Sequence, residues 1–186
     1  MSYFSDQQYQ NINPNSFVPA EYEGCSFIQC NFSGLDLRGF SFENCSFSNC
    51  DLSNLKVPGV SFRGVTFDSC KMLGIHFQSC NPFLIEFTFK NCQLDYCGFY
   101  NLQIKKTVFS SCRMLEADFT MANLTGSSFV GSELSGAVFD QTVLEKADFR
   151  DAQNYRIDPE LNRIKGARFD LGGLPGLLNK YGIRIG

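Results

Sequence analysis

Nine cysteines and a single histidine are the residues of this 186-residue chain with the greatest potential for chemistry. Such residues bind zinc as close pairs that complete a tetrahedron, and a thiolate can also serve in redox or nucleophilic chemistry. Here the cysteines recur at intervals of five or a multiple of five, with one offset of two residues between Cys80 and Cys92. His76 has no partner nearby in the sequence that would complete a catalytic triad. We therefore expect the cysteines to pack in the core, and we expect no metal site, no cofactor and no enzymatic activity.

A large apolar residue follows almost every cysteine by two positions. In FENCSFSNCDLSN, residues 42–54, Cys45 and Cys50 precede Phe47 and Leu52. Twenty-five such large residues, 14 of them Phe, run from Tyr22 to Phe149 with one slip near 81–88. A period of five fits neither the two-residue repeat of a strand nor the 3.6-residue repeat of a helix.

The five-residue unit predicts which side chains point inward. Its first position holds all nine cysteines and, later, Ala, Ser or Thr, which indicates a small buried residue. Its third position is the large one, and the other three are mostly polar. Four units make a square coil of 20 residues, so residues 20 apart should stack about 4.8 Å from one another. About seven coils would form a parallel β-helix, with one column made of Phe27, Phe47, Phe67, Phe89, Phe109, Phe129, Phe149 and Phe169.

The repeat also predicts the domain organisation. Residues 1–20 are polar, and we expect them to be an irregular N-terminal cap; residues 21–169 form the β-helix, and residues 170–186 form a C-terminal cap. Short helices are expected from Asp158 and over Leu174–Tyr181, the latter ending at Gly182. A bulge is expected at about 81–88, where Pro82, Phe83 and Leu84 either contact a partner or fold back over the kink.

The stretches SGLDLRGFSF and EADFTMANLTGSSFVGSELSGAVF resemble the pentapeptide-repeat proteins. This resemblance implies a right-handed, quadrilateral, parallel β-helix. The tail NYRIDPELNRIKGARFDLGGLPGLLNKYGIRI is similar to that of the Qnr quinolone-resistance proteins and of immunity proteins against microcin B17 and albicidin. That group implies a homodimeric rod that mimics DNA and protects DNA gyrase or topoisomerase IV. Many Qnr members carry two larger loops, and this chain has only the short slip.

Acidic residues are the candidates for contact with such an enzyme. The formal net charge is −3, and nine acids against three bases between Met114 and Glu160 make that segment negative. The alternative is that these acids are polar filler of the repeat. The expected topoisomerase-facing residues are Glu116, Asp118, Glu133, Asp140, Asp148 and Asp151.

The C-terminal segment is rich in apolar residues that could serve either of two purposes. They could cover the last coil of their own chain, or they could form a two-fold interface that doubles the rod. The expected interface residues are Leu171, Leu174, Leu177, Leu178, Tyr181, Ile183 and Ile185.

The predicted function is therefore protection of a type II topoisomerase from quinolones or a peptide-like poison. The alternatives are a structural or adaptor rod and an immunity protein that sequesters a toxin directly. We expect no direct binding to nucleic acid or membranes. The sequence shows neither a signal peptide nor a run of apolar residues long enough to span a membrane, which favours a cytoplasmic location.

Overall fold

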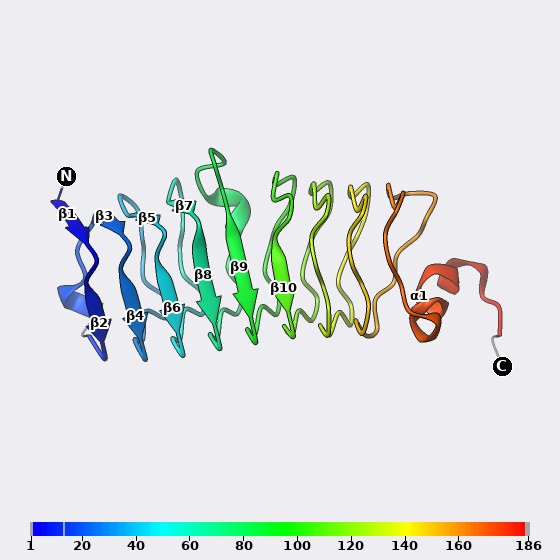
Figure 1. Ribbon diagram of the computed structural model, residues 1–186, viewed down its shortest axis with the longest axis horizontal. Coiled ribbons are helices and arrows are strands. Elements are labelled where there is room, and N and C mark those ends of the chain that lie inside the picture. Colours follow the sequence, from blue (N-terminus) through cyan, green and yellow to red (C-terminus); the bar gives the residue numbers. More distant parts are fainter. Residues whose placement is uncertain (1, 13, 185–186) are drawn as a thin grey trace.

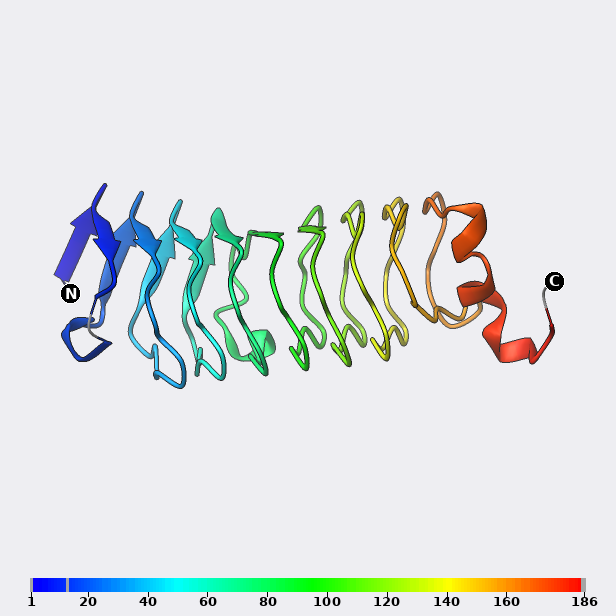
Figure 2. The same cartoon turned by 90° about the horizontal axis from the view of Figure 1, so that it is seen from below.

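The computed structural model describes residues 2–12 and 14–184. The chain winds into a straight rod of stacked coils, a parallel β-solenoid that ends in short helices (Figures 1 and 2). The predicted fold class is therefore confirmed. No helix in the described ranges is long and apolar enough to cross a bilayer.

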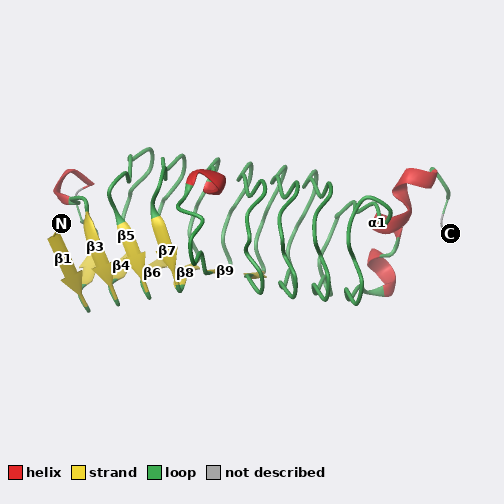
Figure 3. Ribbon diagram, turned by 90° about the horizontal axis from the view of Figure 1, so that it is seen from above, coloured by secondary structure: helices red, strands yellow, loops and turns green. Residues whose placement is uncertain are grey.

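Two parallel sheets form sides of the rod, mainly toward its N-terminal end (Figure 3). After the last strand, isolated bridges such as Val108 to Ser128 and Ser128 to Asp148 continue the same 20-residue register. The four-stranded sheet contains β1 (Ser2–Ser5), β3 (Ala20–Glu23), β5 (Ser41–Glu43) and β7 (Ser61–Arg63). The six-stranded sheet contains β2 (Gln8–Gln10), β4 (Ser26–Ile28), β6 (Ser46–Ser48), β8 (Val65–Asp68), β9 (Phe87–Lys90) and β10 (Val108–Ser110).

Four faces result, and we name them A to D in the order in which the chain visits them. Face A carries the six-stranded sheet and face D the four-stranded sheet. In the C-terminal half, face A includes 107–111, 127–131 and 147–151; face B includes 92–96, 112–116 and 132–136; face C includes 97–101, 117–121 and 137–141; and face D includes 102–106, 122–126 and 142–146.

The large residues of the repeat fill the shaft as predicted, and all 25 of them are buried. The predicted phenylalanine column stacks throughout, with ring centroids 4.6–5.3 Å apart. Phe109 and Phe129, for example, are parallel neighbours at 5.0 Å. Nearly parallel rings at this spacing add attraction to the burial of each side chain.

The cysteines at the first position are all buried and unpaired. They also make a contact that sequence reasoning missed. Cys45 donates its thiol hydrogen to the carbonyl oxygen of Tyr22 in the preceding coil, at 3.3 Å. Ser132 and Thr142 make equivalent hydrogen bonds to the carbonyls of Phe109 and Phe119. Cys, Ser and Thr can therefore occupy the same position of the repeat, because each is small and can donate a hydrogen bond.

The expectation that every first position is small is wrong at Phe87 on face A and at several units of faces C and D. Leu55 and Leu102, for example, are buried there. Leu55 accompanies the smaller Val57, but Phe40 stands beside Phe42, so a large first residue is also accepted next to a large third one.

The corners of the coil explain the polar and Gly content of the repeat. At the fifth position of most units the backbone is left-handed, with φ of 50–82° at residues such as Asn44, Gly59 and Glu116. Gly and Asn adopt this conformation most easily, whereas other residues carry some strain.

The bulge is an insertion of two residues, because β8 pairs with β9 at an offset of 22 rather than 20 residues. Pro82, Phe83 and Leu84 leave the shaft, so the large residue of this unit is missing from the core. Phe87 fills that space from a first position, and its ring lies 5.5 Å from Phe62 and 5.3 Å from Phe89.

The N-terminal segment is not irregular, contrary to our expectation. Strands β1 and β2 pair in parallel with β3 and β4 and add a coil of 18 residues. Phe4 and Tyr9 extend two aromatic columns, and Phe17, after the 3-10 helix η1 (Pro14–Ser16), plugs the end against Phe32 and Phe40. The sequence did not reveal this coil because its units are not five residues long.

The expected helix from Asp158 does not form. The chain makes one turn there, in which Asn162 donates to the Asp158 carbonyl, and then continues as the final coil, where Arg163 bridges to Val143. The second expected helix is present as η3 (Leu171–Gly173), α1 (Pro175–Leu178) and η4 (Asn179–Tyr181). Gly182 ends it with φ 60°, as predicted. A further 3-10 turn, η2 (Phe77–Ser79), lies just before the bulge.

Candidate interaction surfaces

The structure separates the six expected topoisomerase-facing acids onto three faces. Asp148 and Asp151 lie on face A, and Glu116 and Glu133 lie on face B. Asp118 and Asp140 lie on face C, and Glu116 stands at the corner that joins faces B and C. The six residues therefore do not form one surface.

Three of these acids serve the fold. Asp118 and Glu133 accept the backbone N–H of the residue two positions on, at 2.9 Å each, and Asp148 does the same at 3.1 Å. Hydrogen bonding to Arg150 also holds the pKa of Asp148 below its ordinary value. For these acids the alternative explanation, a polar role within the repeat, has a physical basis: the carboxylate stabilises the corner.

Charge varies around the rod rather than along it. The negative balance of residues 114–160 disappears over 102–168, where nine acidic residues meet nine basic ones. Within residues 102–168, face D is basic. Its outward side chains include one acid, Glu145, which pairs with Arg163, and the bases Lys105, Lys106, Lys146, Arg163 and Lys165. Face C has no basic side chain between His76 and Asp158 among its described residues. The negative surface is therefore face C, rather than the whole C-terminal half.

Face C and its corner with face B also carry exposed aromatic and apolar side chains. Tyr96 is 63% exposed, Tyr100 45%, Met121 41% and Val138 45%. The Tyr100 hydroxyl donates to the Met121 sulfur at 3.5 Å, so neighbouring coils meet in one surface. We call this surface the tyrosine–carboxylate patch; it consists of Tyr96, Tyr100, Glu116, Asp118, Met121, Val138 and Asp140.

The bulge exposes Phe83 and Leu84, at 63% and 61%, and Pro82 is also exposed. Asn81 fixes the start of this loop, because its side chain accepts a hydrogen bond from the Phe83 N–H at 3.0 Å and donates one to the Ser61 hydroxyl at 3.1 Å. Of the two alternatives for Phe83, the structure shows the exposed one, in a loop that projects from the rod (Figure 1).

The C-terminal cap docks on the final coil through polar contacts. Lys180 lies 2.7 Å from Asp158 and 2.6 Å from Glu160, and Tyr181 donates to Glu160 at 3.1 Å. The backbone N–H of Ile157 donates to the carbonyl of Gly176 at 3.1 Å. These contacts cover the open end of the solenoid, which would otherwise present unpaired backbone groups.

The expected interface residues of the cap have different environments. Leu177 packs against the core and Leu178 is half-buried. Four are exposed: Leu171 at 87%, Leu174 at 38%, Tyr181 at 56% and Ile183 at 56%. Ile185 lies outside the described residues. The cap therefore covers its own coil and still leaves an apolar outer surface.

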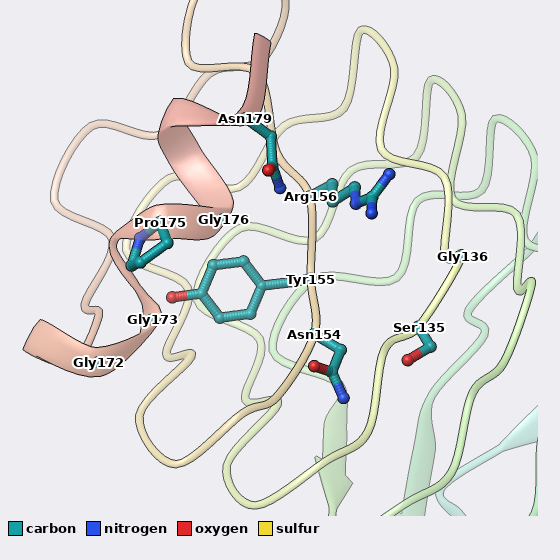
Figure 4. A pocket seen from close by; sticks show the side chains of 10 residues that line it. All are labelled: Ser135, Gly136, Asn154, Tyr155, Arg156, Gly172, Gly173, Pro175, Gly176 and Asn179. Atoms are coloured by element: carbon teal, nitrogen blue, oxygen red, sulfur yellow. The ribbon is translucent and has the colours of Figure 1, made fainter. Parts of the chain in front are cut away.

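Two glycines that sequence reasoning overlooked allow the cap to approach. A Cβ on Gly173 would lie within 3 Å of the Tyr155 ring, and a Cβ on Gly176 would lie 2.4 Å from the Tyr155 carbonyl oxygen. Figure 4 shows the Tyr155 ring between the last coil and the helical segment, in a groove of about 480 Å³ that Arg156 and Asn179 also line. The sequence GGLPG was the available signal, since glycines permit close backbone approach.

The thiols of all nine cysteines lie in the core of the rod, away from solvent. Burial raises the pKa of Cys45 to about 11 and that of Cys97 to about 12, so both thiols stay protonated at neutral pH. The described residues contain no group of three or more metal-ligating side chains.

The fold and its surfaces define the class: a β-solenoid rod whose interior is filled and whose polar side chains lie on its outer faces and ends. Models of pentapeptide repeats match residues 20–99 (pentapeptide repeat region) and 117–153 (pentapeptide repeats, eight copies). These ranges together exceed half of the chain, and the protein belongs to the pentapeptide-repeat family. A comparison with curated protein sequences found no significant match.

Solved structures with a similar fold include two trypsin-treated variants of QnrB1, a plasmid-mediated fluoroquinolone resistance protein. One has a TM-score of 0.67 at 21% identity and covers 99% of this chain and 97% of that chain. The other has a TM-score of 0.64 at 20% identity, with 99% and 98% covered. HetL from Nostoc sp. strain PCC 7120, involved in heterocyst differentiation regulation, has a TM-score of 0.51 at 12% identity, with 92% and 85% covered.

Proposed function

We propose that this protein binds a type II topoisomerase, DNA gyrase or topoisomerase IV, and protects it from quinolones or a peptide-like poison. The observation that carries the proposal is the negative face C on a rigid, straight rod. A DNA-binding surface is positively charged because it neutralises phosphates, and it can accept carboxylates that project from a body of similar shape. The fold that this chain shares with QnrB1 supports the proposal.

The proposal concerns binding rather than catalysis. The interior is packed with aromatic side chains, so it leaves no room for a substrate. Protection would follow if the rod occupied the enzyme surface that a DNA segment otherwise uses, and no cofactor would be required.

A supercoiling assay tests the proposal directly. Gyrase is titrated with ciprofloxacin in the presence and absence of the protein, and we expect the protein to restore supercoiling and to reduce cleaved DNA. The variant Glu116→Lys/Asp140→Lys reverses two unpaired charges beside face C but leaves Asp118, which caps a corner, in place. We expect it to need about tenfold more protein for equal protection, because like charges then oppose the enzyme.

Asp151→Lys is the matched control, since this exposed acid stands at a left-handed corner beside face A. Equal protection by the double variant and the wild type would remove face C from the binding surface. Failure of the wild-type protein to bind or protect either enzyme would overturn the proposal as a whole.

We also propose a homodimer through the outer surface of the cap. Leu171 and Ile183 are exposed there without packing against the rod, and a two-fold contact would bury both copies at once. Light scattering at several concentrations should give twice the chain mass, and Leu171→Arg should give a folded monomer. A wild-type monomer at high concentration would contradict this arrangement.

The similarity to HetL favours a second candidate, a regulatory or adaptor rod with another protein partner. Absence of any effect on gyrase and topoisomerase IV, together with specific capture of another protein, would support it. Binding of the poison itself by the isolated protein would instead indicate sequestration of a toxin.

A further inference from the structure

We infer that the tyrosine–carboxylate patch binds arginine side chains of a protein partner. The inference rests on the proposed function in one respect: it names the groups of the enzyme that would meet face C. The probe described below is independent of any topoisomerase, so the two ideas can fail separately.

The two tyrosines provide flat platforms at both ends of one short segment of face C. Tyr96 stands at the corner before the segment, Tyr100 lies next to the corner residue Asn101 at its other end, and both rings are exposed. Gly98 lies between them, and a Cβ added at this residue would lie 2.5 Å from the Gln78 side-chain oxygen. The Gln78 side chain therefore fills the space that a larger side chain at position 98 would occupy. Four residues of extended chain span about 13 Å, which lets two arginines reach both rings.

The carboxylates stand in the next coils, about 5 and 10 Å further along the rod. Glu116, Asp118 and Asp140 form no ion pair within residues 2–12 and 14–184. Arg113, in the same coil as Glu116, is already paired with the buried Asp95, and Arg156 lies at the C-terminal border of the patch, where it lines a groove with Val138. The negative charge of the patch is therefore available to a partner.

Arginine fits this arrangement better than other groups. Its planar guanidinium can stack on a tyrosine ring while its N–H groups pair with a carboxylate. Lysine pairs with the carboxylate but stacks less well, and a nucleic acid is repelled because its phosphates carry the same sign. The exposed Met121 and Val138 provide apolar contact for the aliphatic part of the side chain.

The test uses a fluorescently labelled, extended peptide with two pairs of arginines four residues apart, and its lysine counterpart. Fluorescence anisotropy with the full-length protein measures the dissociation constant at low and at physiological salt. We expect the arginine peptide to bind at least threefold more tightly than the lysine peptide. Tyr96→Asn/Tyr100→Ser, which uses residues common at these positions, should weaken arginine binding about tenfold and leave lysine binding nearly unchanged.

The controls separate stacking from charge. Tyr96→Phe/Tyr100→Phe should keep the affinity, since the rings remain. Glu116→Gln/Asp140→Asn should reduce the binding of both peptides and its salt dependence. Tyr3→Ala removes a tyrosine of similar exposure, 56%, from the distant face D and should have no effect. Equal binding of the two peptides, or unchanged binding by Tyr96→Asn/Tyr100→Ser, would overturn the inference.

Pull-down with gyrase then distinguishes the two proposals. If the peptide binds at the patch but the wild-type protein captures no topoisomerase, the proposed function fails and the patch stands. If the enzyme is captured and protected equally by wild type and Tyr96→Asn/Tyr100→Ser, the function stands and the role of the patch is refuted.

Discussion

The C-terminal cap can dock only because residue 176 is a glycine, which has no side chain to meet Tyr155. In Gly176→Ala the new methyl group would lie 2.4 Å from the Tyr155 carbonyl oxygen and 2.8–2.9 Å from two atoms of its ring. The carbonyl belongs to the backbone of the final coil and cannot turn away, so α1 must move outward. That movement breaks the hydrogen bond from Ile157 to the Gly176 carbonyl and loosens the packing of Leu177.

The magnitude follows from these losses. A backbone hydrogen bond contributes about 1 kcal/mol and the partly buried Leu177 contributes about 1–2 kcal/mol. Alanine in a helix returns about 1 kcal/mol relative to glycine. If overpacking adds about 1 kcal/mol, the cap should lose about 2–3 kcal/mol of docking free energy. The open state of the cap would then be about 30- to 150-fold more populated.

Hydrogen exchange measures this opening at the Ile157 amide, whose acceptor is the Gly176 carbonyl. Protection at Ile157 should fall by the same factor, while amides in the central coils, such as Phe109, keep theirs. Gly172→Ala is the matched control, because nothing lies within 4 Å of the added methyl, and it should leave protection unchanged. Equal protection in Gly176→Ala and Gly172→Ala would refute the reasoning, since it would show that the cap does not need this close approach.

Three further predictions address the core, the corners and the cap. Cys70→Ser should change the free energy of unfolding in urea by less than about 1 kcal/mol, because the hydroxyl can replace the thiol as donor to the Phe47 carbonyl. Cys70→Leu should lower it by about 1–3 kcal/mol, because the larger side chain overpacks the core. A greater loss in Cys70→Ser than in Cys70→Leu would contradict the role of this position. Lys106→Asn should stabilise the protein by about 0.5–1 kcal/mol, since φ is 59° at Lys106, and the neighbouring Lys105→Asn should not. The Lys180 contact lowers the pKa of Asp158 and Glu160 below their ordinary values of 3.8 and 4.5. The stabilisation from this contact is therefore complete at a pH above the ordinary values, and it is lost as the pH falls through the lowered pKa values. Ile157 protection should therefore decrease in acid, and in Lys180→Met it should lose that dependence on pH.

The sequence by itself determined the interior of the rod. The five-residue unit is a local structure, and its geometry decides which two side chains point inward without reference to the rest of the chain. The eight phenylalanines from Phe27 to Phe169 were therefore placed in one column, and the two-residue insertion near 81–88 was placed correctly, from spacing alone. Gly182 as the end of the cap helix was equally local, because a left-handed C-terminal residue favours glycine.

The tertiary structure alone decided the ends and the arrangement of the outer side chains. The N-terminal coil has 18 residues and Gly176 meets Tyr155, and neither feature repeats, so no period could predict them. Acids close in sequence, such as Asp140 and Asp148, lie on different faces, whereas Tyr100 and Met121 meet across coils. The physical reason is that the conformation of one five-residue unit decides whether a side chain points into the rod or out of it. Contact between outward side chains depends instead on how four units close a coil and on how the coils stack. The surface on which a partner would act therefore becomes visible only in the folded rod.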